Sequence, residues 1–257
     1  MNYKEQLVSA VNIQSRMFNL LDTYLGPLGW LEKEPKKEDG TPLPWFTYPA
    51  ISFLEDIITP EMKVFEYGAG YSTLYFNATV TECNSVEHDK KWIEKLYERN
   101  DKVNVKHLEQ WSAYDPAIKA YVDDFKALKF NHPRTTSFEH DMYHGLINEN
   151  FDAYACEVFS KPVGYYDIIV VDGMARSMCA YMASKAVKDD GFIIFDNAER
   201  HYYNDVEQYL VDQGFGRVDF WGTGPTNSWG WTTSMFSKNF RIKNNKVARP
   251  VIEGPTR

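Results

Sequence analysis

Four residues in the first half of the chain have types and spacing suited to ligand binding: Glu66, Gly68, Gly70 and Ser72, each separated by one position. They follow the apolar run 64–65, which predicts a buried strand, and they precede a segment that can start a helix. Glycines let a ligand approach the backbone, and the first N–H groups of a helix lack partners within it. The pattern therefore predicts a ligand cradle. The charge of Glu66 favours a cationic or hydroxyl-rich ligand over a pyrophosphate.

A second acidic residue, Glu87, ends the next predicted strand, about 20 residues beyond the glycine turn. A carboxylate at this position can accept hydrogen bonds from both hydroxyls of a ribose. Another interpretation is that Glu87 and Asp89 only cap the following helix, and Asp89 is well placed to be an N-cap. Nicotinamide-dependent dehydrogenases use a similar acid, so Glu87 alone does not distinguish between cofactors.

From residue 62 onward, short apolar runs alternate with helical patterns. Strands are predicted at 62–67, 83–87, 103–107, 166–171 and 191–195, and helices at 72–78, 89–99, 176–188 and 203–213. Such alternation is typical of a parallel sheet with crossover helices. The runs 216–222 and 232–237 are strand-like and have no helix between them, which predicts an antiparallel strand at the end of the domain.

The remaining segments complete the predicted organisation. Residues 1–60 form an N-terminal helical cap, with helices at 4–25 and about 51–58, residues 61–240 form the main domain, and residues 241–257 form a tail. Within the main domain, residues 108–165 are much longer than a crossover helix requires, and they are rich in aromatic residues. We therefore expect this insertion to be a lid or a substrate-recognition element.

The acidic-x-Gly-x-Gly pattern of residues 66–70 resembles the first motif of class I S-adenosylmethionine-dependent methyltransferases. The resemblance covers about residues 41–107 and 164–237, and it is nearest to a little-characterised bacterial and phage-type branch. It implies an α/β fold with a Rossmann-like seven-stranded sheet, mostly parallel with an antiparallel C-terminal strand. It also implies that S-adenosylmethionine lies across the strand ends. The residues implied to hold it are Glu66, Gly68, Gly70 and Ser72 at the methionine end, Glu87 at the ribose, and Asp172 beside the transferred methyl group.

A narrower resemblance concerns Asp172 and the pair Asp196-Asn197, which look like the metal triad of catechol and caffeoyl-CoA type O-methyltransferases. In those enzymes a divalent cation, usually magnesium, binds the substrate hydroxyls. Three oxygen ligands at neighbouring strand ends suit such a hard cation. The other interpretation is that Asp196-Asn197 forms a turn and that Asp172 caps a helix or accepts a hydrogen bond from a substrate. The sequences flanking the triad differ from those of the metal-dependent enzymes.

The resemblance implies methyl transfer, and we expect the acceptor atom to be an oxygen of a small molecule or sugar. The metal triad would polarise this oxygen, or Asp172 or His201 would accept its proton directly. Arg176 and Arg200 either grip an anionic substrate or form ordinary ion pairs.

The composition narrows the choice of partners and compartment. The 257 residues carry a formal net charge of −8 and are 44% hydrophobic, with no concentrated Lys/Arg run. This argues against nucleic acid as a partner, and the apolar runs are too short for a membrane span. The cysteines Cys83, Cys156 and Cys179 are scattered, which fits a reducing compartment. We therefore expect a cytoplasmic protein with a small-molecule substrate.

Two other classes of protein remain open. A nicotinamide oxidoreductase would require the glycine turn to bind a pyrophosphate, which Glu66 opposes and for which the third glycine is missing. A non-catalytic binding module with a relic cofactor site also fits these residues.

Overall fold

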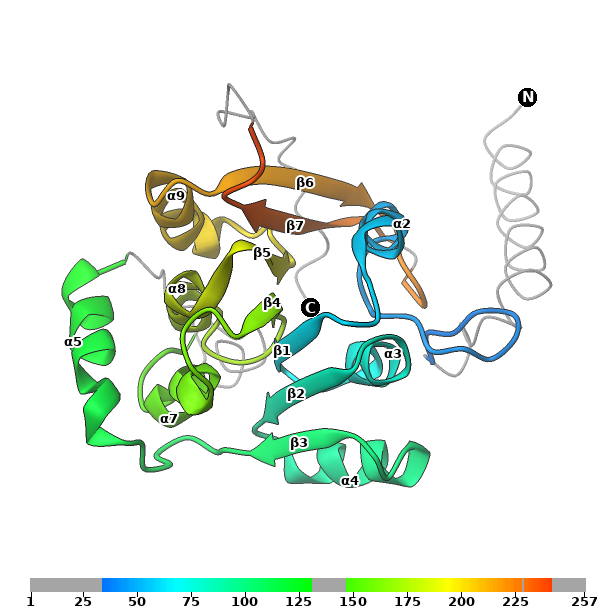
Figure 1. The fold of residues 1–257 in the computed structure, drawn as a ribbon, viewed down its shortest axis with the longest axis horizontal. Helices are drawn as coiled ribbons and strands as arrows, with labels where there is room; N and C mark the ends of the chain where they lie inside the picture. The colour runs from blue at the N-terminus through cyan, green and yellow to red at the C-terminus, as the bar shows by residue number, and fades with distance from the viewer. Residues whose placement is uncertain (1–33, 131–146, 228, 242–257) are drawn as a thin grey trace, which may run out of the picture.

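The computed structural model describes residues 34–130, 147–227 and 229–241. A seven-stranded sheet in the order β3-β2-β1-β4-β5-β7-β6 runs through the centre (Figure 1). The first five strands are parallel: β1 (Lys63–Tyr67), β2 (Glu82–Glu87), β3 (Asn104–His107), β4 (Tyr166–Val171) and β5 (Val187–Asp196). β7 (Trp231–Ser237) is antiparallel to both β5 and β6 (Gly216–Gly222). The predicted sheet, mostly parallel with an antiparallel strand near the C-terminus, is confirmed.

The central strands are apolar on both faces because helices cover both sides of the sheet. Val64 and Ile168 pack on the face covered by α2 (Tyr48–Ile57) and α3 (Tyr71–Thr79). Phe65 and Ile169, one residue further along, pack on the opposite face, beside α8 (Arg176–Ala186) and α9 (Asn204–Asp212). This alternation follows from the two-residue period of a strand.

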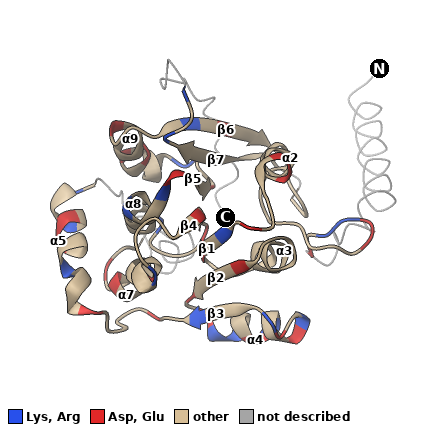
Figure 2. Ribbon diagram, in the orientation of Figure 1, with Lys and Arg blue, Asp and Glu red and all other residues tan. Residues whose placement is uncertain are grey.

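Helix α4 (Lys90–Arg99) begins at Asp89, whose side chain accepts hydrogen bonds from the N–H groups of Lys91 and Trp92. Asp89 is therefore the N-cap that its residue type predicts. Only Ile93 and Leu96 of this helix are buried, and acidic and basic side chains alternate along the rest of it, as Figure 2 also shows for α5 (Lys119–Leu128). Both helices thus present a charged face to solvent.

The described parts of the insertion belong to the core. Helix α5 packs against α8, and so do α7 (Asp152–Cys156) and the 3₁₀ turn η3 (Glu157–Ser160). A second turn, η2 (Pro116–Ile118), leads into α5. Val122, Phe125 and Phe151 are buried in the same cluster as the sheet residues. The hydroxyl of Tyr67 on β1 donates a 2.6 Å hydrogen bond to the carbonyl of Ala155. These parts therefore belong to the same helical layer as α8 and α9, and residues 131–146 lie outside the described part of the chain.

The N-terminal segment is described only from residue 34, so the helix predicted at 4–25 lies outside the described residues, as does most of the predicted tail. The second predicted helix is α2, which begins at Tyr48 because Pro49 suits the first turn of a helix. Phe46, Ala50 and Leu54 are fully buried against the sheet, so this segment completes one face of the core. Within the described ranges, no helix is long and apolar enough to cross a lipid bilayer.

The core position of the insertion can be tested with two of its aromatic residues. Phe151 is 1% exposed and packs edge to face with Tyr154, whereas Trp111 is 75% exposed. Phe151→Ala should lower the free energy of unfolding by about 3–5 kcal/mol because it leaves a cavity, and Trp111→Ala should change it by less than about 0.5 kcal/mol. Urea unfolding of both variants measures the difference, and equal values would contradict the assignment of α7 to the core.

Candidate functional site

The register of the sheet brings the predicted ligand-binding residues to one edge. On β1, Tyr67 is opposite Val86 of β2 and Val171 of β4. The next residues along the three strands are Gly68, Glu87 and Asp172, so they emerge at the same level. Because the chain leaves β1 for β2 on one side and reaches β4 on the other, this edge is a topological switch point, where α/β sheets bind their ligands.

Two glycines allow the backbones of β1 and β4 to touch. Gly68 has φ +92°, and a Cβ placed on it would lie 2.6 Å from the Cα of Gly173. A Cβ on Gly173 would lie 2.7 Å from the nitrogen of Gly68 and 2.1 Å from the hydroxyl of Tyr154. Any side chain at either position would push the two strand ends apart.

Gly70, by contrast, borders open space. The nearest atom to a Cβ built on this residue is the hydroxyl of Ser72, 3.9 Å away, and the backbone of Gly70 is extended. Gly70 also precedes α3, whose first N–H groups point out of the helix. The space beside Gly70 is therefore available to a ligand.

Glu66 lies completely buried beneath this turn. Its Oε2 accepts hydrogen bonds from the hydroxyls of Thr73 and Ser85, the latter at 3.0 Å. Thr73 Oγ1 in turn accepts a 2.8 Å hydrogen bond from the N–H of Gly70. Glu66 Oε1 accepts no hydrogen bond from the described residues. The carboxylate thus ties the glycine turn to β2 through Thr73 and Ser85.

Burial raises the pKa of Glu66 to about 7. The nearby hydroxyl of Ser72 and the hydrogen bonds from Thr73 and Ser85 favour the ionised form and oppose this rise in pKa, and the negative charge of Asp172 adds to it. Ser72 is itself 3% exposed, so it supports the turn from inside.

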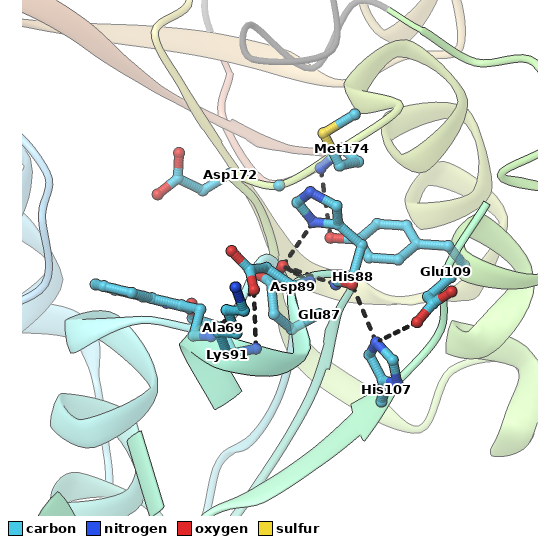
Figure 3. A network of polar contacts seen from close by, with 12 residues as sticks. Ala69, Glu87, His88, Asp89, Lys91, His107, Glu109, Asp172 and Met174 are labelled. Carbon is cyan, nitrogen blue, oxygen red and sulfur yellow. Dashed lines mark hydrogen bonds and ion pairs between the residues drawn. The ribbon is translucent and has the colours of Figure 1, made fainter. Parts of the chain in front are cut away.

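Glu87 is held rigidly at the end of β2 (Figure 3). Its Oε1 accepts hydrogen bonds from the N–H groups of His88, at 2.7 Å, and Asp89, at 2.8 Å, and it lies 2.6 Å from Nδ1 of His88. Burial alone would lower the pKa of His88, but its contact with Glu87 outweighs burial and raises it. Glu87 Oε2 accepts no hydrogen bond from the described residues, so one fixed carboxylate oxygen is left for a ligand.

Arg176, at the start of α8, joins the ends of β4 and β5 and is 8% exposed. Its guanidinium makes four hydrogen bonds and one ion pair, all at 3.1 Å or less. The hydrogen bonds go to the carbonyls of Gly173 (3.0 Å), Asp196 (2.8 Å) and Asp172 (2.8 Å) and to Oδ1 of Asn197 (3.1 Å), and the ion pair joins Nη2 to Oδ1 of Asp172 (2.9 Å). The guanidinium therefore lies between the residues that were predicted to form a metal triad.

The acids of this cluster are partly desolvated. Burial raises the pKa of Asp172, although the charge of Arg176 opposes the shift. Burial, reinforced by the charge of Asp172, raises the pKa of Asp196 to about 8. Asp196 Oδ1 accepts hydrogen bonds from Thr233 Oγ1 at 2.6 Å and from Trp231 Nε1 at 3.0 Å, so its side chain is bound to β7.

These contacts do not fit the predicted magnesium site. Oδ1 of Asp172 and Oδ1 of Asn197, two of the oxygens that would bind a cation, face Arg176, and Oδ1 of Asp196 accepts from β7. In the described part of the chain, no group of three or more His, Cys, Asp or Glu side chains could hold a metal ion. Arg176 is not available to an anionic substrate either, because it is buried and each of its guanidinium nitrogens is engaged by the protein.

The second predicted proton acceptor, His201, lies on the loop that follows β5. It is exposed at the start of the 3₁₀ turn η4 (His201–Tyr203), with its ring 4.1 Å from that of Tyr202. Its neighbour Arg200 has its guanidinium Nε 3.8 Å from Glu199, and its positive charge favours the ionised form of Asp172.

Four supporting residues were missed in the sequence: Thr73, Ser85, Tyr154 and Gly173. Thr73 comes three residues after Gly70, the spacing at which a helix N-terminus is often closed by a side chain, so this position had a local signal. Ser85 is opposite Glu66 only once β1 and β2 are paired in register, and Tyr154 reaches Gly173 from a helix of the insertion. Nothing local in the sequence marks these last contacts.

Known proteins resemble this chain only distantly. No protein-family model and no curated protein matches the sequence. Among solved structures, precorrin-6y C5,15-methyltransferase from Geobacter metallireducens is 12% identical with a TM-score of 0.45, over 74% of this chain and 87% of the other. A methyltransferase-like protein from Silicibacter pomeroyi is 17% identical with a TM-score of 0.45, over 76% and 89%. Spermidine synthase from Thermotoga maritima is 14% identical with a TM-score of 0.41, over 70% and 54%. At these identities and TM-scores the similarity assigns neither a family nor an activity to this chain.

The contact between the two glycines gives a stability prediction. Gly173→Ala should lower the free energy of unfolding by about 3 kcal/mol or more, because the new Cβ overlaps the hydroxyl of Tyr154 and backbone atoms of Gly68. Gly70→Ala, where the space is open, should cost less than about 1 kcal/mol. Urea unfolding of both variants tests this, and a wild-type midpoint for Gly173→Ala would show that the strand ends are not in tight contact.

The raised pKa of Glu66 predicts a pH dependence. The unfolded chain releases this proton near the ordinary pKa of 4.5, whereas the folded chain keeps it until about pH 7. Stability from this group is therefore complete below about pH 4.5 and is lost as the pH rises toward 7. Glu66→Gln cannot ionise, so its free energy of unfolding relative to wild type should rise by about 3 kcal/mol between pH 4.5 and 8.

Urea unfolding of wild type and Glu66→Gln at several pH values measures this difference. Asp196 has a pKa shift of the same sign and contributes equally to both proteins, so it cancels in the comparison. Parallel pH profiles for the two proteins would show that Glu66 ionises normally in the folded state.

Proposed function

We propose that this protein is an S-adenosylmethionine-dependent methyltransferase that methylates an oxygen of a small-molecule or sugar-type acceptor. The observation that carries the proposal is the convergence of the glycine turn, Glu87 and Asp172 at the ends of three adjacent parallel strands. At one edge of the sheet the glycine turn provides an open backbone cradle, Glu87 provides a fixed acceptor for hydroxyl groups, and Asp172 provides a further carboxylate.

The ribose end of the cofactor suits Glu87. Its Oε1 is engaged by His88 and Asp89, so the carboxylate is oriented before any ligand binds. The remaining oxygen, Oε2, can accept a hydrogen bond from a ribose hydroxyl, and such charge-assisted hydrogen bonds are strong. Preorganisation lowers the entropic cost of this contact.

The charge of the site favours the cationic end of S-adenosylmethionine. Glu66 lies beneath the glycine turn, and Glu87 and Asp172 flank it. The negative charge of Glu87 acts to raise the pKa of Asp172, and that of Asp172 acts to raise the pKa of Glu66. A sulfonium and an ammonium group are stabilised by such a negative environment, whereas a pyrophosphate is repelled. This supports S-adenosylmethionine over a nicotinamide dinucleotide.

When bound, S-adenosylmethionine supplies a methyl group on a positively charged sulfur, which the acceptor oxygen displaces in line. The protein contributes alignment and removes the proton of the acceptor. Asp172 is our candidate for the proton acceptor because it stands at the end of β4 beside the glycine turn. Burial raises its pKa, which makes its carboxylate a stronger base than an exposed one. His201 is the second candidate for this role.

Ligand-dependent melting separates this proposal from the two other classes of protein. S-adenosylhomocysteine at about 100 times its dissociation constant should stabilise the folded state by about 2.7 kcal/mol, which corresponds to a rise in Tm of roughly 5–10 °C. NAD⁺ should produce no rise. A rise with NAD⁺ alone would favour an oxidoreductase, and no rise with either ligand would favour a binding module.

The role of Glu87 gives a sharper prediction. Glu87→Ala should weaken S-adenosylhomocysteine binding by about 1.5–3 kcal/mol, or roughly 10- to 150-fold in Kd, because the charge-assisted hydrogen bond to the ribose is lost. Glu82→Ala, at the opposite end of the same strand, should bind normally. Isothermal titration calorimetry of the two variants is the measurement, and normal affinity in Glu87→Ala would remove the main support for this cofactor.

A further inference from the structure

A buried positive charge already occupies the position where the sequence predicted a metal ion. The guanidinium of Arg176 makes five contacts within 3.1 Å, two with side-chain oxygens of Asp172 and Asn197 and three with backbone carbonyls. These are hard oxygen donors that converge from the ends of two parallel strands, which is the arrangement that a divalent cation also requires. The same atoms cannot serve both cations.

The two loops that Arg176 joins carry unusual backbone. Ala175 has φ +50° and Asn197 has φ +54°, and residues other than glycine rarely adopt this left-handed region. Such conformations persist where surrounding contacts determine them. Arg176 supplies these contacts on both sides, through Gly173 on the β4 loop and through Asp196 and Asn197 on the β5 loop.

The remaining member of the predicted triad is also engaged. The side chain of Asp196 accepts hydrogen bonds from Thr233 and Trp231 of β7, and only its backbone carbonyl faces Arg176. Asp172 is the acid that both contacts the guanidinium and stands at the switch point beside the glycine turn. Arg176 therefore determines the position of this carboxylate, with all of its donors directed inward.

We propose that the guanidinium of Arg176 replaces a divalent cation at the ends of β4 and β5, as a positioning residue that fixes the Asp172 carboxylate, and that the site works without a metal ion. The inference rests on the proposed methyltransferase function only for the role of Asp172 toward an acceptor. Arg176 acts on a substrate only through Asp172, because it is buried and each of its guanidinium nitrogens is engaged by the protein.

The test is manganese binding, which is measured by the loss of the electron paramagnetic resonance signal of free Mn²⁺. Wild type should leave this signal unchanged at millimolar Mn²⁺, and its affinity for S-adenosylhomocysteine should be equal in EDTA and in Mn²⁺. Arg176→Ala frees the oxygens of Asp172 and Asn197, so this variant should gain an Mn²⁺ site with a Kd of about 0.1–1 mM, typical of weak oxygen-ligand sites. The double variant Arg176→Ala/Asp172→Asn should lose it again.

Arg200→Ala is the matched control. It removes a positive charge that also acts on Asp172 but none of the five contacts of Arg176, so it should gain no Mn²⁺ site. Arg176→Ala should melt roughly 6–15 °C lower than wild type because a buried charge network is broken, and Arg176→Lys should melt between the two and bind no Mn²⁺. These readouts do not require methyl transfer, so they separate this inference from the proposed function.

Two results would overturn the proposal. One is Mn²⁺ binding by wild type that disappears in Asp172→Asn, since a metal would then share the site with Arg176. The other is a folded Arg176→Ala variant with no gain of Mn²⁺ binding, since the guanidinium would then not fill a cation position. Should Arg176→Ala fail to fold, the wild-type measurement and Arg176→Lys decide, and Mn²⁺ binding by either would contradict the proposal.

Discussion

The candidate site depends on the contact between the backbones of Gly68 and Gly173. Because neither residue has a Cβ, the ends of β1 and β4 approach until the atoms touch, and this approach sets the position of everything beside them. The glycine turn follows on one side and Asp172 precedes on the other, while Glu87 is brought to the same level by the pairing of β1 with β2. A van der Waals constraint between two backbones thus determines how far apart the cradle and the carboxylates lie.

This close approach brings three carboxylates together in a site with little access to water. The fold offsets the desolvation cost of their charges in a different way for each acid. Glu66 receives two hydroxyl hydrogen bonds and keeps a raised pKa, so part of its charge is removed by a proton. Glu87 is stabilised by two backbone N–H groups and by the neighbouring His88. Asp172 is paired with Arg176. The site therefore remains acidic enough to attract a cationic ligand while its carboxylates are held by the protein itself.

The insertion contributes to the same construction from the opposite face of the sheet. Tyr154, on α7, is fully buried, and its hydroxyl lies where a side chain on Gly173 would be, so it closes the back of the strand contact. Tyr67 is tied to Ala155 by a hydrogen bond of 2.6 Å. The described residues of the insertion thus support the site from behind, which is a structural role that a long, aromatic-rich segment between two strands did not suggest.

The sequence by itself determined the strand and helix pattern, the antiparallel end of the sheet, the glycine turn and the N-cap Asp89, because each depends on local periodicity, backbone freedom or a side chain beside its own backbone. It also brought Asp172, Asp196 and Asn197 to one edge, since parallel strands end together. Only the tertiary structure decided what those side chains bind. Arg176, on α8, donates to Asn197. Thr233 and Trp231, on β7, donate hydrogen bonds to Asp196, and Ser85 on β2 donates one to Glu66 on β1. These contacts join residues far apart in the chain, so no local pattern carries their information.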